Sequence, residues 1–175
     1  EVWGSEDYEK VEIFYRTFLK NILKISSYTS NAMVYGEMGK YKLEKHVKLR
    51  LSSYWCRLIN GKDSKLSYIM YKVEKLMHFD DSSEYTSKWI QCVKSIFDST
   101  GLSFLWESEI DNFNPNYVKA LLNLQLNDIN KQEWNEAISN NSQYTFYRMF
   151  KEDKQLENFL LCLDKKDAIN LTKFR

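Results

Sequence analysis

Two adjacent aspartates, Asp80 and Asp81, are the side chains of this sequence whose type and spacing most resemble a catalytic pair. A polymerase places such a pair at the tip of a β-hairpin, where the two carboxylates hold the two metal ions of phosphoryl transfer. The flanks do not fit a hairpin, because KLMHF on one side has the character of a helix end and SSEYTSK on the other side is polar. Ser82, Ser83 and Glu84 are residues that cap helices. We therefore expect DDSSE (80–84) to end one helix and cap the next, without a metal site.

Other groups that could do chemistry are few and far apart. His46 and His78 have no cysteine or carboxylate at ligand spacing, so neither a zinc site nor a histidine-activated nucleophile is supported. Gly36, Gly39 and Lys40 in YGEMGKY mimic a phosphate-binding loop, but their spacing is G-x-x-G-K and no strand precedes them. A turn between two helices explains these glycines better. The sequence thus predicts no catalytic residue, no metal and no cofactor, and the chain by itself is not expected to be an enzyme.

One region stands out by its charge. It runs from Lys40 to Arg57 and has a single acidic residue, Glu44, against six basic ones. In a helix, His46, Arg50 and Arg57 follow one another at spacings of four and seven, so one edge could meet phosphates. The alternative is an ordinary solvated helix face. The candidate nucleic-acid contacts are Lys45, His46, Lys48, Arg50, Tyr54 and Arg57. A shorter basic cluster near the C-terminus, equally ambiguous, contains Lys165, Lys166, Lys173 and Arg175.

Composition predicts an all-α fold. The 175 residues include only 5 Gly and 1 Pro, far too few for the many tight turns of a strand-rich domain. Hydrophobic residues at 43% can form a real core, and we expect one helical domain over 1–175, cut from a longer protein. The net charge of +1 gives no large field of either sign that would attract nucleic acid or membrane.

The cysteines and the absence of targeting signals bear on location. Cys56, Cys92 and Cys162 are far apart in apolar helical stretches, which is typical of reduced thiols packed as small hydrophobic side chains. No apolar run of ~18 residues could span a bilayer, and the first residues do not resemble a signal peptide. We expect a protein of the cytoplasm or nucleus with no membrane partner.

Hydrophobic periodicity predicts an irregular bundle of about seven or eight helices. Apolar residues at helical spacing are expected to face inward. In the first helix they are Val11, Phe14, Tyr15, Phe18, Leu19, Ile22 and Leu23, and in another they are Leu66, Ile69, Met70, Val73, Leu76 and Met77. Ser30 or Asn31 is expected to cap a short helix, and Asn114 followed by Pro115 to open the longest one. GLSFLWE (101–107) is the only stretch that could be extended. Helical periodicity covers 5–24, 32–38, 42–59, 66–77, a stretch with Trp89 to Phe97 that Gly101 closes, and 115–138, and shorter periodic pieces follow at 144–150, 156–163 and 167–175.

Eight short stretches, taken in order, resemble the region downstream of the reverse-transcriptase palm in the LINE-type, non-LTR retrotransposon polyproteins of animals. The resemblance covers nearly the whole chain. The stretches are EVWG (1–4), NAMVYGEMGKYKL (31–43), RLSSYWCRL (50–58), KLSYIMY (65–71), GLSFLWE (101–107), QEWNEAI (132–138), YRMFK (147–151) and LTKFR (171–175).

This resemblance implies a thumb-side or connector segment between the palm and a C-terminal zinc element of an RNA-directed DNA polymerase. Asp80 and Asp81 do not align with the polymerase aspartates, so the segment would be non-catalytic and would help to position template RNA and nascent DNA. Its implied partners are RNA or an RNA–DNA duplex and the other domains of the polyprotein. The alternative is a protein-interaction or scaffold module without a nucleic-acid role, which predicts a contiguous exposed apolar patch.

Overall fold

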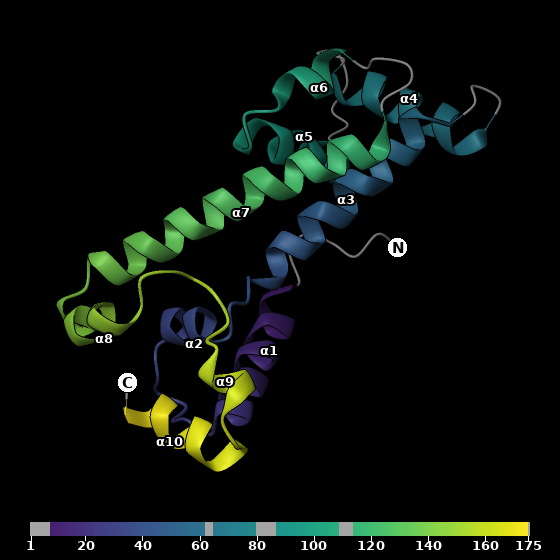
Figure 1. The fold of residues 1–175 in the computed structure, drawn as a ribbon. Coiled ribbons are helices and arrows are strands. Elements are labelled where there is room, and N and C mark those ends of the chain that lie inside the picture. Colours follow the sequence, from purple (N-terminus) through teal and green to yellow (C-terminus); the bar gives the residue numbers. More distant parts are fainter. Residues whose placement is uncertain (1–7, 62–64, 80–86, 109–113, 175) are drawn as a thin grey trace. The chain divides into compact units, whose positions relative to one another are not determined.

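Figure 1 shows the chain in a computed structural model, which describes residues 8–61, 65–79, 87–108 and 114–174. Within these ranges every regular element is a helix, and the only extended pairing is an isolated bridge between Met38 and Leu156. The all-α prediction is confirmed. The helices are α1 (Tyr8–Leu23), α2 (Asn31–Glu37), α3 (Leu43–Ile59), α4 (Leu66–Phe79), α5 (Lys88–Ser99), α6 (Ser103–Ser108), α7 (Pro115–Ser139), the 3-10 helix η1 (Ser142–Tyr144), α8 (Thr145–Phe150), α9 (Phe159–Cys162) and α10 (Lys165–Phe174).

The chain divides into two compact units, and the division falls inside α7. The described residues of unit 1 lie in Glu44–Asn127, and those of unit 2 lie in Glu6–Leu43 and Asp128–Arg175. Whether the two units form the single domain that was expected over 1–175 depends on how they pack on each other. The single-domain expectation stays a prediction. Each unit is described below by itself.

Helix ends follow the expected capping chemistry in two places and depart from it in a third. The Ser30 side chain accepts a hydrogen bond from the Ala32 N–H at 3.2 Å, and Asn114 accepts one from the Asn116 N–H at 3.0 Å. Residues 80–84 lie outside the described residues, and the N-cap of α5 is Ser87, whose hydroxyl accepts from the Ile90 N–H at 3.2 Å. The prediction that DDSSE caps this helix is therefore wrong.

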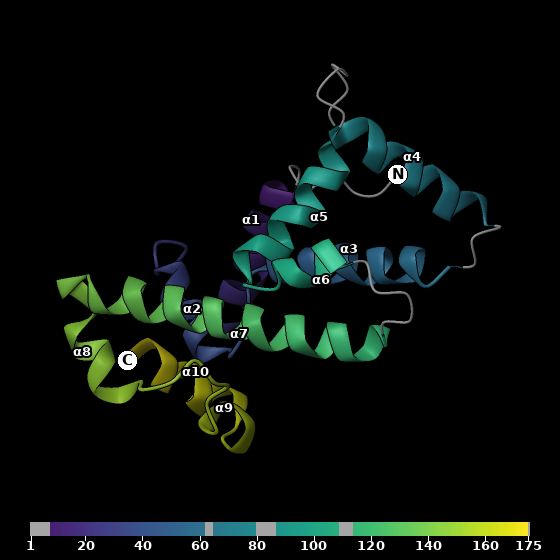
Figure 2. The same ribbon diagram turned by 90° about the horizontal axis from the view of Figure 1, so that it is seen from above.

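Unit 1 is built around Trp55 of α3, whose side chain is completely buried. Its indole Nε1 donates a hydrogen bond to the Tyr71 hydroxyl at 3.0 Å. The centre of its ring lies 4.7 Å from the centre of the Phe97 ring and 5.6 Å from that of the Trp106 ring. These contacts join α3, α4, α5 and α6, and the first turns of α7 add Val118 and Leu122 to the same core (Figure 1, Figure 2).

The core of unit 2 contains polar groups that are bonded to one another. Glu12 of α1 is buried, and its carboxylate accepts hydrogen bonds from the Tyr35 hydroxyl and from the Leu43 N–H, the latter at 2.7 Å. Burial and the bond to Glu12 raise the pKa of the Tyr35 phenol. Elsewhere in the unit the Trp134 Nε1 donates to the Ala32 carbonyl at 2.8 Å, which ties α7 to α2. A buried carboxylate is tolerated here because donors surround it.

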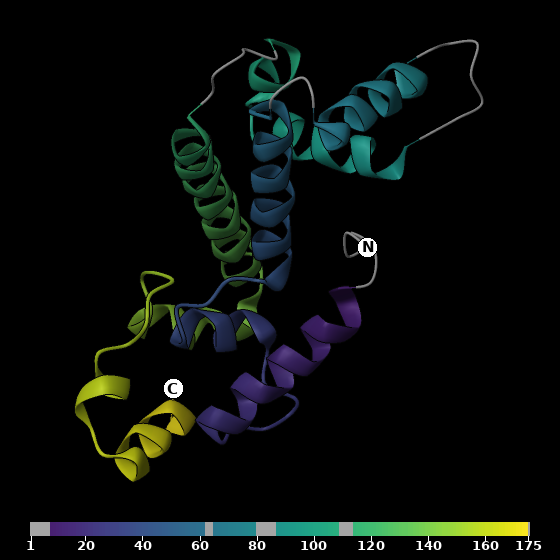
Figure 3. The same cartoon turned by 90° about the vertical axis from the view of Figure 1, so that its right-hand side faces the viewer.

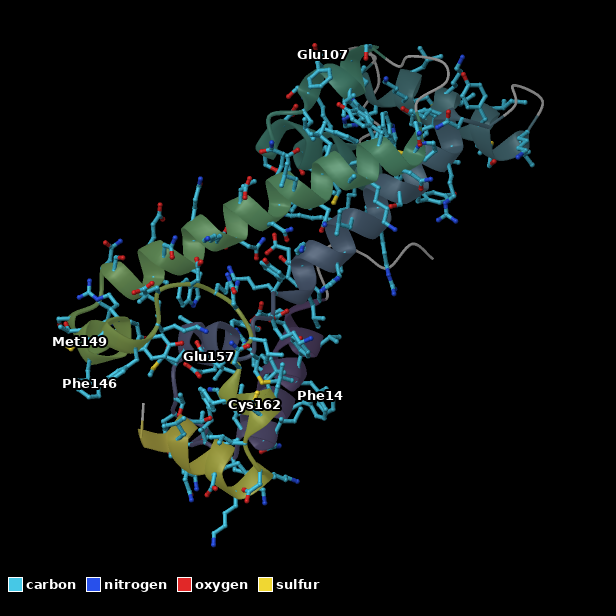
Figure 4. All side chains as sticks on the ribbon, viewed as in Figure 1. Phe14, Glu107, Phe146, Met149, Glu157 and Cys162 are labelled. Carbon is cyan, nitrogen blue, oxygen red and sulfur yellow. The ribbon has the colours of Figure 1, made fainter. Side chains whose placement is uncertain are left out.

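α4 faces the other way from the sequence prediction, and α1 does so only in part. α1 buries Leu19 and Leu23 as expected, together with Glu12, whereas Val11, Phe14, Phe18 and Ile22, which were also expected to face inward, are 44% to 73% exposed. α4 buries Tyr68 and Tyr71 and exposes its aliphatic residues, as detailed below. Figure 4 shows Phe14 on the outer side of α1. Periodicity finds an amphipathic helix, but it does not tell which of the helix's apolar residues meet the core.

The segment 101–107 is also helical where extended structure was possible. The Leu102 N–H donates to the Phe97 carbonyl at 2.9 Å, and α6 follows, burying Leu105 and Trp106. Gly101 has a φ of 69°, a left-handed conformation that suits glycine at the end of a helix. The glycine thus joins two helices instead of a helix and a strand.

Gly39 joins α2 to α3 in the turn that the sequence predicted for YGEMGKY. Its φ is 56°, its N–H donates to the Gly36 carbonyl at 3.2 Å, and the next N–H, of Lys40, donates to the Tyr35 carbonyl at 3.1 Å. A Cβ at this position would collide with the backbone of Leu156 and lie 2.8 Å from the Gln155 carbonyl carbon. The turn interpretation is confirmed, and the close approach of the 155–156 backbone adds a second reason for glycine.

The substitutions Gly39→Ala and Gly101→Ala separate the cost of a positive φ from the cost of a close approach to the backbone. Both substitutions place alanine at positive φ, which costs about 1 kcal/mol or somewhat more. Only Gly39→Ala also forces a methyl group against backbone atoms, so we expect it to lose about 3 kcal/mol of unfolding free energy against about 1 kcal/mol for Gly101→Ala. Urea unfolding followed by circular dichroism measures both, and equal losses would contradict the tight packing of Gly39 on residues 155 and 156.

Candidate nucleic-acid interface

α3 presents one exposed polar stripe formed by His46, Arg50, Tyr54 and Arg57. These residues follow one another at spacings of four, four and three, so they lie on one side of the helix. Leu51, Trp55 and Leu58, on the opposite side, are buried in the core of unit 1. The core contacts therefore fix the orientation of the stripe.

Lys45 does not belong to this stripe. It is only 6% exposed, and its ammonium donates a hydrogen bond to the side-chain oxygen of Asn127. Burial lowers the pKa of the Lys45 ammonium, because a charge is less stable away from water. The sequence predicted Lys45 as a candidate nucleic-acid contact, but in the structure its side chain is buried.

Lys48 is also turned from the stripe. Its ammonium lies 2.8 Å from a carboxylate oxygen of Glu44, one helical turn earlier, and both side chains are about one-third exposed. The acidic partner neutralises much of the field that a phosphate would feel. The candidate set therefore contracts to His46, Arg50, Tyr54 and Arg57.

Tyr54 is held between a cation and a second aromatic ring. The guanidinium carbon of Arg57 lies 5.9 Å from the centre of the Tyr54 ring, and the half-buried Trp89 of α5 meets that ring edge-on at 5.9 Å. Tyr54 remains 37% exposed. Trp89 is a residue that sequence reasoning missed, because nothing in the local pattern of α5 shows that this ring reaches Tyr54.

Arg50 and Arg57 carry the permanent positive charge of the stripe. Among the residues that the structure describes, no carboxylate lies within ion-pair distance of Arg50 or Arg57. An exposed guanidinium is a planar donor that matches phosphate geometry. The stripe thus combines two such donors with one partly exposed aromatic ring.

The second basic cluster lies on α10, in unit 2. Lys165, Lys166 and Lys173 are exposed there, and Arg175 lies outside the described residues. No aromatic ring is paired with these lysines in the described part of the chain. This cluster is a scatter of cations, whereas the stripe on α3 pairs cations with a ring.

The remaining groups that could do chemistry have structural surroundings. The Nδ1 of His78 accepts a hydrogen bond from the Ser87 N–H at 3.1 Å, and its ring packs edge-on against Phe79. Asp80 and Asp81 lie outside the described residues. No three potential ligands among histidine, cysteine, aspartate and glutamate come together in the described ranges.

The three cysteines differ in their surroundings, although all were expected to be packed. Cys56 is buried in unit 1, Cys92 is half-buried and Cys162 is exposed, so the expectation for Cys162 is wrong. Burial raises the pKa of the Cys56 thiol to about 11. A reactive cysteine needs the opposite shift, since the thiolate is the nucleophile.

Comparisons with models of protein families, with curated proteins and with solved structures find no match to this chain. The resemblance to retrotransposon polyproteins therefore stays a prediction. None of the helices in the described residues combines the length and the apolarity that a membrane span requires.

The order of thiol reactivity tests the burial of Cys56. With a disulfide reagent at pH 8, we expect Cys162 to react first, Cys92 more slowly, and Cys56 at least about 100-fold more slowly than Cys162. The reason is that Cys56 is both buried and almost fully protonated at that pH. Mass spectrometry of the labelled peptides identifies each site, and denaturant should make all three react. Labelling of Cys56 as fast as Cys162 in the folded protein would contradict this core.

Proposed function

We propose that the chain is a non-catalytic helical segment of a retrotransposon reverse transcriptase and that the α3 stripe helps to position template RNA and nascent DNA. The observation that carries this proposal is the exposed set of His46, Arg50, Tyr54 and Arg57 on one side of α3. The parent protein is taken from the sequence resemblance. The contact surface is taken from the geometry of unit 1.

The stripe has dimensions that suit a nucleic-acid backbone. From residue 46 to residue 57 a helix advances about 16 Å at roughly 1.5 Å per residue. This length is close to five base steps of a duplex at ~3.4 Å each. Arg50 and Arg57 therefore meet different phosphates of one strand when α3 lies along it.

The binding would be independent of sequence. Arginine contacts to phosphates give affinity that falls with salt, and they fix the register of the nucleic acid without reading its bases. Tyr54 adds a ring face on which an unpaired base can stack. Trp89 limits the movement of that ring, so less freedom is lost on binding.

Partners and location follow from the same proposal. RNA or an RNA–DNA duplex would occupy the stripe, and other domains of the parent polyprotein would supply the catalytic groups. The protein would then work in the cytoplasm or the nucleus. The whole proposal depends on the stripe binding a phosphate backbone. The affinity of this binding can be measured directly.

Binding of the full 175-residue chain to a fluorescent RNA–DNA duplex at low salt tests this function. We expect Arg50→Gln with Arg57→Gln to weaken binding about 10-fold or more and to lower the slope of log affinity against log salt by about 2, one for each lost phosphate contact. Both side chains are exposed, so the thermal unfolding temperature should not change.

Lys165→Gln with Lys166→Gln is the matched control, because it removes two exposed cations from α10. We expect it to lose little affinity. Equal binding by wild type and the α3 variant, or a loss confined to the α10 variant, would overturn the proposed interface. Glu44→Gln provides a gain-of-function check, since it releases Lys48 from its carboxylate and should raise affinity.

A further inference from the structure

One side of α4 is apolar and exposed in the part of the chain that the structure describes. Its residues repeat every seven positions over two heptads. Leu66 and Val73 occupy one heptad position, Ile69 and Leu76 a second, and Met70 and Met77 a third. Each of these six side chains is exposed, from 45% at Ile69 to 72% at Leu66. No charged residue lies within this set. We call these six residues the α4 outer face.

The packing of unit 1 holds the α4 outer face toward solvent. Tyr71 on the opposite side accepts the hydrogen bond from Trp55, and Tyr68 is buried beside it. The Lys75 ammonium lies 4.7 Å from the centre of the Trp106 ring, and α4 lies against α5 (Figure 3). Rotating α4 to bury its aliphatic residues would break all of these contacts. The exposure therefore follows from the core itself.

The size of the α4 outer face fits a dimer. Its exposed side chains present on the order of 600 Å², which is at the upper end of the apolar patches found on monomers. Full burial of two such faces would remove about 1,200 Å² from water, which is the lower limit of stable and specific interfaces. We propose that unit 1 associates with a second copy of this chain through α4, helix against helix.

The charged border of the face selects the direction of pairing. Lys65 and Lys72 border one edge of the α4 outer face, whereas the methionines Met70 and Met77 lie toward the other edge. Antiparallel helices related by a two-fold axis bring like edges together, so the Lys72 side chains of the two copies meet. Parallel helices instead place each Lys72 beside the methionine edge of the other copy. The pairing is therefore parallel, with Val73 opposite Val73 of the second copy.

Sedimentation equilibrium of the full chain without nucleic acid tests the association. We expect a dimer with a dissociation constant in the micromolar range and a monomer after Leu76→Lys. Leu161→Lys on α9 is the matched control, because Leu161 is 70% exposed and Leu76 is 71% exposed. Its dimer should be as stable as that of wild type, and circular dichroism should show the same helix content in all three proteins.

Disulfide trapping tests the direction. In a Cys162→Ser background, Leu66→Cys is expected to form a covalent dimer on mild oxidation, because parallel helices place the two copies of residue 66 side by side, whereas antiparallel helices place residue 66 near residue 77 of the second copy. Ser67→Cys, exposed on the same helix but off the face, should remain monomeric. A wild-type chain that stays monomeric at 200 µM, or loss of the dimer in Leu161→Lys as well, would overturn the proposal and assign the face to another protein or to none. Crosslinking between Leu66→Cys and Met77→Cys chains, without crosslinking of Leu66→Cys to itself, would overturn the parallel pairing. Because no nucleic acid is present, these results are independent of the α3 stripe.

Discussion

The hydrogen bond from Trp55 to Tyr71 is the contact on which the surfaces of unit 1 depend. An indole N–H and a phenol hydroxyl are costly to bury alone, so each finds its partner in the other, at 3.0 Å. The bond fixes the rotation of α3 and of α4 about their own axes. Once both rotations are set, Arg50, Tyr54 and Arg57 point to solvent on one helix, and the aliphatic residues point to solvent on the other.

The stacked rings around Trp55 make this orientation hard to change. Phe97 and Trp106 lie close enough to touch it, and Lys75 covers Trp106 from outside. Aromatic pairs of this kind add about 0.5–1.5 kcal/mol each beyond the area they bury. A rotation of α4 would give up the hydrogen bond from Trp55 to Tyr71, the edge-on contact of Tyr71 with Trp89 and the contact of Lys75 with the Trp106 ring. The core therefore buries the aromatic side of α4 and leaves its aliphatic side exposed.

Local features of the fold were predictable from the sequence. Helix content followed from the scarcity of glycine and proline, and the caps at Ser30 and Asn114 followed from the residues themselves. The rotation of α4, and the edge of the α1 stripe that is buried, were not predictable, because only the tertiary partners decide which apolar residues of a helix meet the core. For the same reason Glu12 was missed, since a buried carboxylate is recognised only when Tyr35 and the Leu43 N–H are seen around it.

The candidate interface shows the same limit at the scale of single residues. Sequence spacing aligned His46, Arg50 and Arg57, and these three side chains are exposed. The spacing rule alone did not exclude Lys45, because its burial depends on packing near Asn127, 82 residues away. The pairing of Lys48 with Glu44, one helical turn earlier, is local and agrees with their i,i+4 spacing. The spacing rule could not find Trp89 either, since that ring belongs to another helix.

A charged stripe on α3 and an apolar face on α4 have a joint physical consequence. One stripe has two arginines, and two phosphate contacts give only weak binding at physiological salt. A chain paired through α4 carries the stripe twice, and binding by one copy raises the effective concentration of the other near the same nucleic acid. This gain requires that both stripes reach one molecule at once, because geometry that forbids simultaneous contact removes it entirely. Weak nucleic-acid binding by each single stripe is therefore compatible with tight binding by a pair of stripes. This requires that the core around Trp55 holds the α3 stripe and the α4 outer face in a fixed orientation.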